Sequence, residues 1–311
     1  MQSSGQQHLE HLEQNSAGRA FCLWGMPGIG KSHALEGKFR LLAPQVLRLN
    51  PTTDASWNGF SIVVLEDLHL IPDGKSWALE QAAKLENYPG LTLWTTHRSP
   101  LPPPFVNLEW PALNRLETDP LLKTQLKALT PPEALEWIYS RTLGHPQFAL
   151  EYLRYLSRQG FLWSDGTHWR WRNPPEHFFP PTVEALVQGW TRIFTAQSPE
   201  KRVLESAALL PEDADEKLRA SVVDLPLERW KAARDTLERE GLLRGMQPSH
   251  PLMGEGILRG LSSEAHTHYS RKILSALEAA GVQPTPALVS GARLDASHTL
   301  ELYSRLAQEA R

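Results

Sequence analysis

A glycine-rich octapeptide constrains the fold of this chain more than any other feature. It lies between an apolar run, residues 20–24, and a helix-compatible segment, residues 33–40. The octapeptide is Gly25-Met26-Pro27-Gly28-Ile29-Gly30-Lys31-Ser32, which fits the pattern G-x-x-x-x-G-K-[ST] of a phosphate-binding loop. Such glycines let the backbone curl so that successive N–H groups point at one anion, and the following helix N-terminus adds partial positive charge. The sequence therefore predicts a strand, loop and helix that bind a nucleoside triphosphate.

The last residues of the loop carry the charge and the metal ligand. We expect Lys31 to reach the β- and γ-phosphates and Ser32 to hold Mg²⁺. His33 follows directly, and we expect it to complete the nucleotide contacts together with the rest of the loop. A glycine-rich strand-to-helix turn that ends in Lys-Ser by chance would match the same pattern, so the prediction depends on the other parts of the site.

A second apolar run ends in two acidic residues. Residues 61–65 are apolar after Ser61 and rich in β-branched side chains, as in a buried parallel strand, and Glu66 and Asp67 follow them. Open α/β sheets bind their ligands at the carboxyl ends of such strands. We assign Glu66 to the metal, through water, and Asp67 to polarising the attacking water. The reverse assignment stays open, because Asp is more usual than Glu as the first carboxylate of such a strand. A solvated acidic turn without function is a further alternative.

A third strand candidate ends in polar residues that could serve the same site. Residues 91–96 follow a helical stretch, residues 76–88, and precede His97-Arg98. The hydroxyls of Thr95 and Thr96 could orient water there, and the Arg98 guanidinium could sense the γ-phosphate through a bidentate contact. The alternative is a strand that simply runs into the proline-rich loop after it.

Composition sets the remaining bounds. With 311 residues and 41% hydrophobic content, the chain can bury more than one core. One cysteine, Cys22, excludes a disulfide framework and fits a reducing compartment. The first residues are polar and no apolar run approaches the length of a membrane span, so we expect a cytoplasmic protein with no signal peptide. A net charge of −3 gives no electrostatic footprint for nucleic acid, so any DNA contact would have to be local.

The second half of the chain changes from sheet to helix patterns. After a further short strand and turn within residues 107–116, helical periodicity covers residues 121–129, 134–139 and 148–156. Residues 161–172 alternate around Asp165-Gly166, which predicts a hairpin whose tryptophans could form a patch for a partner. Later helical patterns cover residues 182–194, 199–209, 227–240, 262–280 and 288–311, and residues 241–244 could start a small β wing.

These patterns predict an α/β fold in which a P-loop NTPase parallel sheet is followed by a helical lid, a winged helix and C-terminal helices. The predicted domains are a P-loop NTPase domain (1–118), a lid with a β-hairpin (119–172), a winged helix (173–260) and C-terminal helices that could start a helical repeat array (261–311).

The order of these parts resembles the signal-transduction ATPases with numerous domains (STAND), a branch of the AAA+ superfamily. It resembles most the ATPase core of large bacterial transcriptional regulators of the LuxR type. The motifs that carry the resemblance are residues 24–32, 64–69, 95–98, 143–151, 240–244 and 250–252.

The resemblance implies roles for two further residues. In such proteins the proline of a G-x-P element in the lid approaches the adenine, which here would be Pro146. A histidine turn after the winged helix contacts the ADP β-phosphate, which here would be His250; a capping or core histidine is the alternative. The usual Gly-Arg-Glu element before the first helix is replaced by Gly5-Gln6-Gln7, so base affinity is expected to be reduced.

Together these expectations describe a slow ATPase that acts as a switch. ADP would hold the lid and the winged helix closed, ATP with Mg²⁺ would open them, and hydrolysis would reset the state. The resemblance implies transcriptional regulation, self-association on ATP binding, and a protein partner or output domain whose identity is open. One alternative is an AAA+ ATPase that binds duplex DNA through the winged helix. It is disfavoured because the candidate recognition helix carries acidic as well as basic residues. The other alternative is a small-molecule P-loop kinase.

Overall fold

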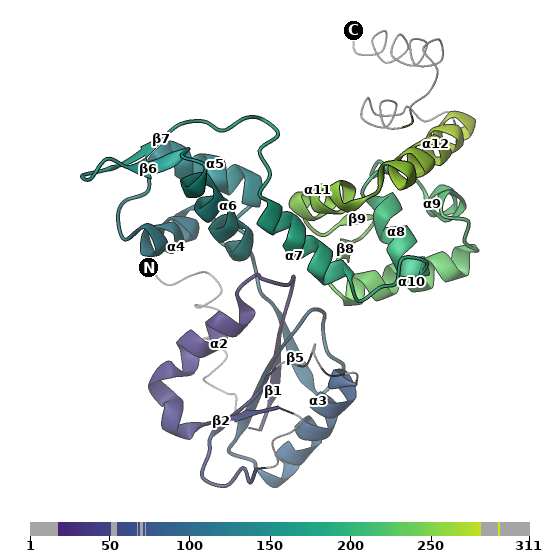
Figure 1. Cartoon of the computed structure of the whole chain (residues 1–311). Coiled ribbons are helices and arrows are strands. Elements are labelled where there is room, and N and C mark those ends of the chain that lie inside the picture. The colour runs from purple at the N-terminus through teal and green to yellow at the C-terminus, as the bar shows by residue number, and fades with distance from the viewer. Residues whose placement is uncertain are drawn as a thin grey trace. The chain divides into compact units, whose positions relative to one another are not determined.

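The chain divides into two compact units, which are described separately. The structure is a computed structural model that describes residues 18–50, 55–66, 68, 71, 73–280 and 292 (Figure 1). The first unit is Met1–Phe178 and the second is Phe179–Arg311. The finer division into four domains stays a prediction.

A parallel sheet of five strands forms the base of the first unit. Its strands are β1 (Ala20–Trp24), β2 (Val46–Leu49), β3 (Ile62–Leu65), β4 (Thr92–His97) and β5 (Phe105–Glu109). The order across the sheet is β2-β3-β4-β1-β5, and every pairing is parallel. The predicted strands at residues 20–24, 61–65 and 91–96 are confirmed, whereas β2 was not expected and β5 begins before the range that the sequence indicated.

Helices cover both faces of this sheet. Alternate strand residues, among them Cys22, Val63 and Leu93, pack with α3 (Gly74–Ala83) on one face. The residues between them, among them Leu23 and Val64, pack with α2 (Lys31–Phe39) on the other, and Figure 1 shows the two helices on opposite sides of the strands. A sheet buried on both faces explains why these strands are apolar without alternation.

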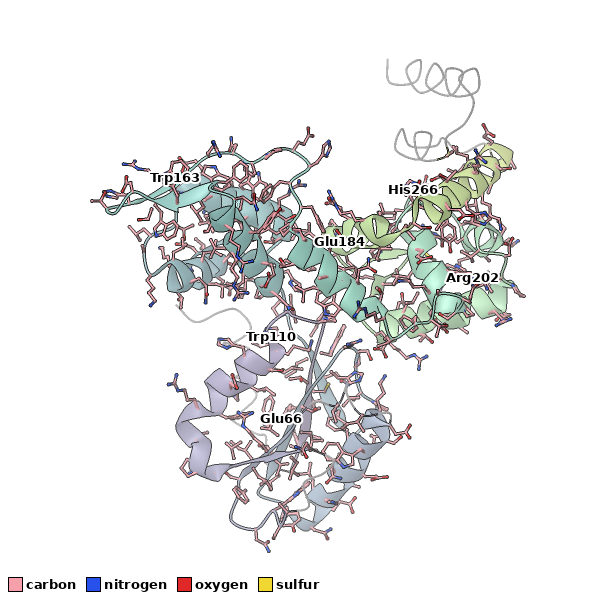
Figure 2. All side chains as sticks on the ribbon, in the orientation of Figure 1. Glu66, Trp110, Trp163, Glu184, Arg202 and His266 are labelled. Atoms are coloured by element: carbon pink, nitrogen blue, oxygen red, sulfur yellow. The ribbon has the colours of Figure 1, made fainter. Side chains whose placement is uncertain are left out.

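Beyond the sheet and the helices that cover it, the described part of the first unit contains three α-helices and a hairpin. They are α4 (Arg115–Leu126), α5 (Pro132–Thr142), α6 (Pro146–Arg158), β6 (Leu162–Ser164) and β7 (Trp169–Trp171). The hairpin turns at Asp165, whose carboxylate accepts hydrogen bonds from two backbone amides of the turn. Trp171 packs inward against Trp137, with ring centroids 5.8 Å apart, whereas Trp163 is 42% exposed (Figure 2). The predicted hairpin is confirmed.

The second unit is helical with one short hairpin. Its elements are α7 (Pro181–Thr191), α8 (Pro199–Ala207), α9 (Glu216–Val222), α10 (Leu227–Arg239), β8 (Leu243–Arg244), β9 (Gln247–Pro248), α11 (Pro251–Gly260) and α12 (Ser263–Ala280). The four helices expected between residues 182 and 280 are confirmed. Helices α9 and α11 were missed, and the helix expected at 288–311 lies outside the described residues. The assignment as a winged helix stays a prediction.

A buried arginine holds part of the second unit together. Arg219, on α9, is 1% exposed, and its guanidinium donates to the carbonyl oxygens of Pro211, Ala214 and Met246 at 2.6–2.8 Å. These bonds join the loop before α9 to the β8–β9 turn. A cation paired with carbonyl dipoles in this way is compensated for its loss of water.

The described helices include none whose length and apolar character would allow it to cross a bilayer.

Candidate functional site

The glycine-rich loop lies at the carboxyl edge of the parallel sheet. It joins the end of β1 at Trp24 to the start of α2 at Lys31. Gly28 and Gly30 have φ angles of 76° and 96°, in the left-handed region that side chains disfavour. Gly30 is also the N-cap of α2, and without a side chain it cannot accept from the first-turn amides. The loop therefore presents backbone N–H groups to a ligand at a helix N-terminus.

Lys31 folds back over the loop. Its ammonium group donates to the carbonyl oxygens of Gly25 and Met26 at 2.7 and 2.8 Å. Burial, together with the smaller effect of the positive charge of Arg98, lowers the pKa of Lys31 from 10.5 to about 8. The structure thus brings two predicted site residues, Lys31 and Arg98, within electrostatic reach of each other. Because both are cations, a phosphate between them would interact favourably with each.

The remaining loop residues have distinct positions. Ile29 is buried and its amide donates to the carbonyl oxygen of Met26 at 3.4 Å, which anchors the loop. Ser32 is exposed at the second position of α2. His33 lines an open surface cavity of about 570 Å³ beside α2 and β2, together with Arg40 and others. Its contact with nucleotide stays a prediction.

The two threonines at the end of β4 differ in environment. Thr95 is fully buried and its hydroxyl donates to the Leu65 carbonyl oxygen at 3.1 Å, so it stabilises the sheet instead of orienting water as we expected. Thr96 is partly exposed and alternates to the other face, the face that α2 covers. Of the two hydroxyls, only that of Thr96 remains a candidate for the site.

Glu66 is held by a residue that the sequence did not indicate. It directly follows β3, and its carboxylate forms an ion pair with Arg48 on β2, with the two side chains 38% and 41% exposed. Any role of Glu66 at a metal ion would have to compete with this pair. Asp67 lies outside the described residues.

The loop and the end of β3 offer oxygen donors of the kind that Mg²⁺ prefers, but the described residues form no complete set of metal ligands. Within the described part of the chain, no three His, Cys, Asp or Glu side chains cluster as metal ligands. Mg²⁺ is usually held by one or two protein oxygens together with the phosphates of its nucleotide. The Ser32 hydroxyl and the Glu66 carboxylate are oxygen donors of this kind.

The start of α6 contacts the phosphate loop. A Cβ atom built on Gly30 would lie 3.9 Å from both Pro146 Cγ and Trp110 Nε1, and Figure 2 marks the position of Trp110. The neighbouring His145 lies with its Nε2 atom 2.9 Å from the Pro27 carbonyl oxygen. Proline at the predicted G-x-P element therefore does lie beside the loop. No local sequence signal indicates Trp110 or the His145 contact, because both depend on chain segments far apart.

His250 belongs to the second unit and caps a helix. It is buried, and its Nδ1 atom accepts a hydrogen bond from the Leu252 amide at 3.0 Å at the N-cap of α11. Its backbone is extended, with φ −152° and ψ 143°, as a residue before proline should be. A contact between His250 and the nucleotide stays a prediction.

Comparison with known proteins supports the fold. No protein-family model matches the chain, and no curated protein matches its sequence. The structure is similar to a Walker-type ATPase from Pyrococcus abyssi, with a TM-score of 0.53 and 13% identity over 81% of this chain and 94% of that one.

Two further similarities are more distant. A STAND protein with a tetratricopeptide repeat sensor from Pyrococcus horikoshii matches with a TM-score of 0.38 and 16% identity over 92% of this chain, which spans 46% of the length of that protein. AMPPCP-bound DnaA from Aquifex aeolicus matches with a TM-score of 0.40 and 12% identity over 77% of this chain and 90% of that one. The five-stranded parallel sheet, the flanking helices and the loop at its edge give the first unit the α/β fold of P-loop NTPases.

Proposed function

We propose that this chain binds ATP and ADP at the loop of residues 25–32 and hydrolyses ATP slowly. The observation that carries the proposal is Lys31, which is partly buried, has a lowered pKa and lies near the charge of Arg98. A buried lysine beside another cation gains from a polyanion, and the loop around it supplies backbone donors.

The residues of the site would divide the work as follows. Loop amides and Lys31 would bind the phosphates, with Ser32 and Glu66 on a magnesium ion that supplies charge neutralisation. Asp67 would polarise the attacking water and Arg98 would contact the γ-phosphate. Glu66 would have to leave its ion pair with Arg48 before it could serve as a magnesium ligand, because one of its carboxylate oxygens is already paired.

The proposal extends to a switch. The position of Pro146 beside the loop supports a response of the lid to a bound nucleotide. By resemblance to STAND proteins, ADP would favour a closed arrangement that includes His250, and ATP an open one that self-associates or engages a protein partner in transcriptional regulation. Duplex DNA binding by the second unit and phosphorylation of a small molecule remain the alternatives, and no described contact favours either.

The direct test is titration of fluorescent ATP with Lys31→Ala. We expect the variant to lose most of its affinity, because Lys31 is needed only where anionic charge is bound. Lys38→Ala is the matched control, since it removes the same charge from the other end of α2. Both variants should retain the circular dichroism spectrum of the parent chain. Undiminished ATP binding by folded Lys31→Ala would refute the proposal.

Turnover assays separate the two acids. Asp67→Asn should keep ATP and Mg²⁺ bound while suppressing phosphate release, and Glu66→Gln should weaken the Mg²⁺ dependence. Exchanged phenotypes would reverse the two roles. Normal hydrolysis by both variants would remove the pair from the chemistry, and accumulation of a phosphorylated product in place of free phosphate would select the kinase alternative.

A further inference from the structure

One buried histidine joins the lid helix to the phosphate loop. His145 is fully buried at the N-cap of α6, where its Nδ1 atom accepts a hydrogen bond from the Phe148 amide at 3.3 Å. Its Nε2 atom lies 2.9 Å from the Pro27 carbonyl oxygen, 118 positions earlier in the chain. Because an amide can only donate, Nδ1 carries no proton and the neutral ring bears its proton on Nε2. The ring therefore caps α6 and donates to Pro27 at the same time.

This hydrogen bond fixes the direction of a neighbouring amide. The peptide bond between Pro27 and Gly28 is trans. In a planar trans peptide the C=O and N–H bonds point in opposite directions. With the Pro27 oxygen held toward His145, the Gly28 N–H must point away from the lid helix. Amides of a phosphate loop are its anion-binding groups, so the orientation of this donor matters for phosphate affinity.

The turn that carries His145 is itself held closely. Gly144 has φ 74°, and a Cβ atom built on it would lie 1.6 Å from the Leu113 carbonyl oxygen. The Leu113 amide also donates to the Gly144 carbonyl oxygen at 3.0 Å. Beyond His145, the Gln147 side chain lies against the loop, since a Cβ atom on Gly28 would meet its Oε1 atom at 2.0 Å. The turn before α6 thus contacts Leu113 on one side and the phosphate loop on the other.

We propose that His145 is a positioning residue for phosphate binding. Its hydrogen bond to Pro27 holds the Gly28 amide toward a bound diphosphate or triphosphate, and it couples the start of α6 to phosphate occupancy. The inference rests on nucleotide binding at this loop. A loop that reorients when phosphate leaves would break the bond to His145 and loosen the lid at the same place.

The variant His145→Asn tests this coupling while keeping the cap. Asn is among the best N-cap residues, and its short side chain has no atom at the position of Nε2. The lost hydrogen bond should weaken ADP and ATP binding by about 3- to 10-fold. Adenosine, which has no phosphate, should bind as it does to the parent chain. The unfolding midpoint without nucleotide should fall by about 2–6 °C, because the cap is retained but the hydrogen bond to Pro27 and the ring contact with Phe148 are lost.

Three further variants keep the result interpretable. His168→Asn, on the exposed hairpin, should change neither affinity nor midpoint. His145→Ala should weaken ADP binding as much as His145→Asn but lower the midpoint by about a further 2–4 °C, because it also removes the cap. His145→Ser keeps a cap with another side chain and replaces His145→Asn if that variant does not fold.

The possible outcomes distinguish this inference from the proposed function. ADP affinity equal to that of the parent chain in folded His145→Asn would overturn the role of His145 and leave nucleotide binding standing. Equal losses for ADP and adenosine would also overturn it, since a general loosening of the lid would then explain the result. Failure of the parent chain itself to bind ATP would refute the proposed function instead.

Discussion

Gly144 tests how tightly the lid turn is packed, and Gly160 provides its control. Both glycines are left-handed, with φ 74° and 70°. A Cβ atom on Gly144 would lie 1.6 Å from the backbone oxygen of Leu113, whereas a Cβ atom on Gly160 would meet nothing within 4 Å. Substitution by alanine therefore adds the same backbone strain at both positions but a steric conflict at only one.

The two costs can be separated. Left-handed alanine costs about 1–2 kcal/mol, partly offset by about 0.4–1 kcal/mol from the smaller entropy of the unfolded chain. We expect Gly160→Ala to destabilise by about 1 kcal/mol. In Gly144→Ala the backbone must also move away from Leu113, which loses the 3.0 Å hydrogen bond from the Leu113 amide. The strain, the lost bond and the repacking together should cost about 3–4 kcal/mol.

Thermal unfolding followed by circular dichroism measures the difference. For a unit of this size each kcal/mol lowers the midpoint by roughly 2–4 °C, so Gly160→Ala should lose about 3 °C and Gly144→Ala about 9 °C or more. Because the chain has two units, the transition of the first should be identified by its ADP-dependent shift. Equal midpoints for the two variants would refute the close approach of Gly144 to Leu113.

Three further predictions concern Lys31, Arg219 and His250. The pKa of Lys31 is lowered to about 8, so phosphate binding should take up a proton and ATP affinity should fall as pH rises above about 8. The stability of the free chain should rise from there toward pH 10.5, because the unfolded lysine binds more protons than the folded one in this range. Calorimetry in buffers of different ionisation enthalpy measures the proton uptake, and an ATP affinity that does not depend on pH would contradict the prediction. Arg219→Met should destabilise the second unit by about 3 kcal/mol in urea unfolding, because four carbonyl oxygens lose their donor. A loss under about 1 kcal/mol would show that water replaces the guanidinium. His250→Ala should lower the free energy of unfolding by about 1 kcal/mol, because a helix cap is lost, and should speed ADP release in stopped-flow exchange. His250→Asn should restore the stability but not the release rate. An ADP release rate unchanged in both variants would remove His250 from the switch.

The elements that can be predicted from the sequence are those whose signals are local. Strand β1, the glycine-rich loop and the start of α2 follow one another within 20 residues, so their residue types and spacing suffice to predict them. Strands β3 and β4 are apolar because both of their faces are buried, and the Asp165-Gly166 turn specifies its own hairpin. These features depend on backbone preferences and on hydrophobic burial, which neighbouring residues encode.

Features that depend on contacts between distant segments follow only from the folded structure. Strand β2 is short and three of its four residues are only partly buried or exposed, so its sequence lacks a strand pattern until β3 pairs with it. That pairing brings Arg48 to Glu66 and alters the expected availability of the acid. Thr95 turned inward because strand alternation placed its hydroxyl beside the Leu65 carbonyl oxygen. The bond from His145 to Pro27 joins residues 118 positions apart, and no local propensity encodes such a distance, because it is set by the packing of the lid on the loop.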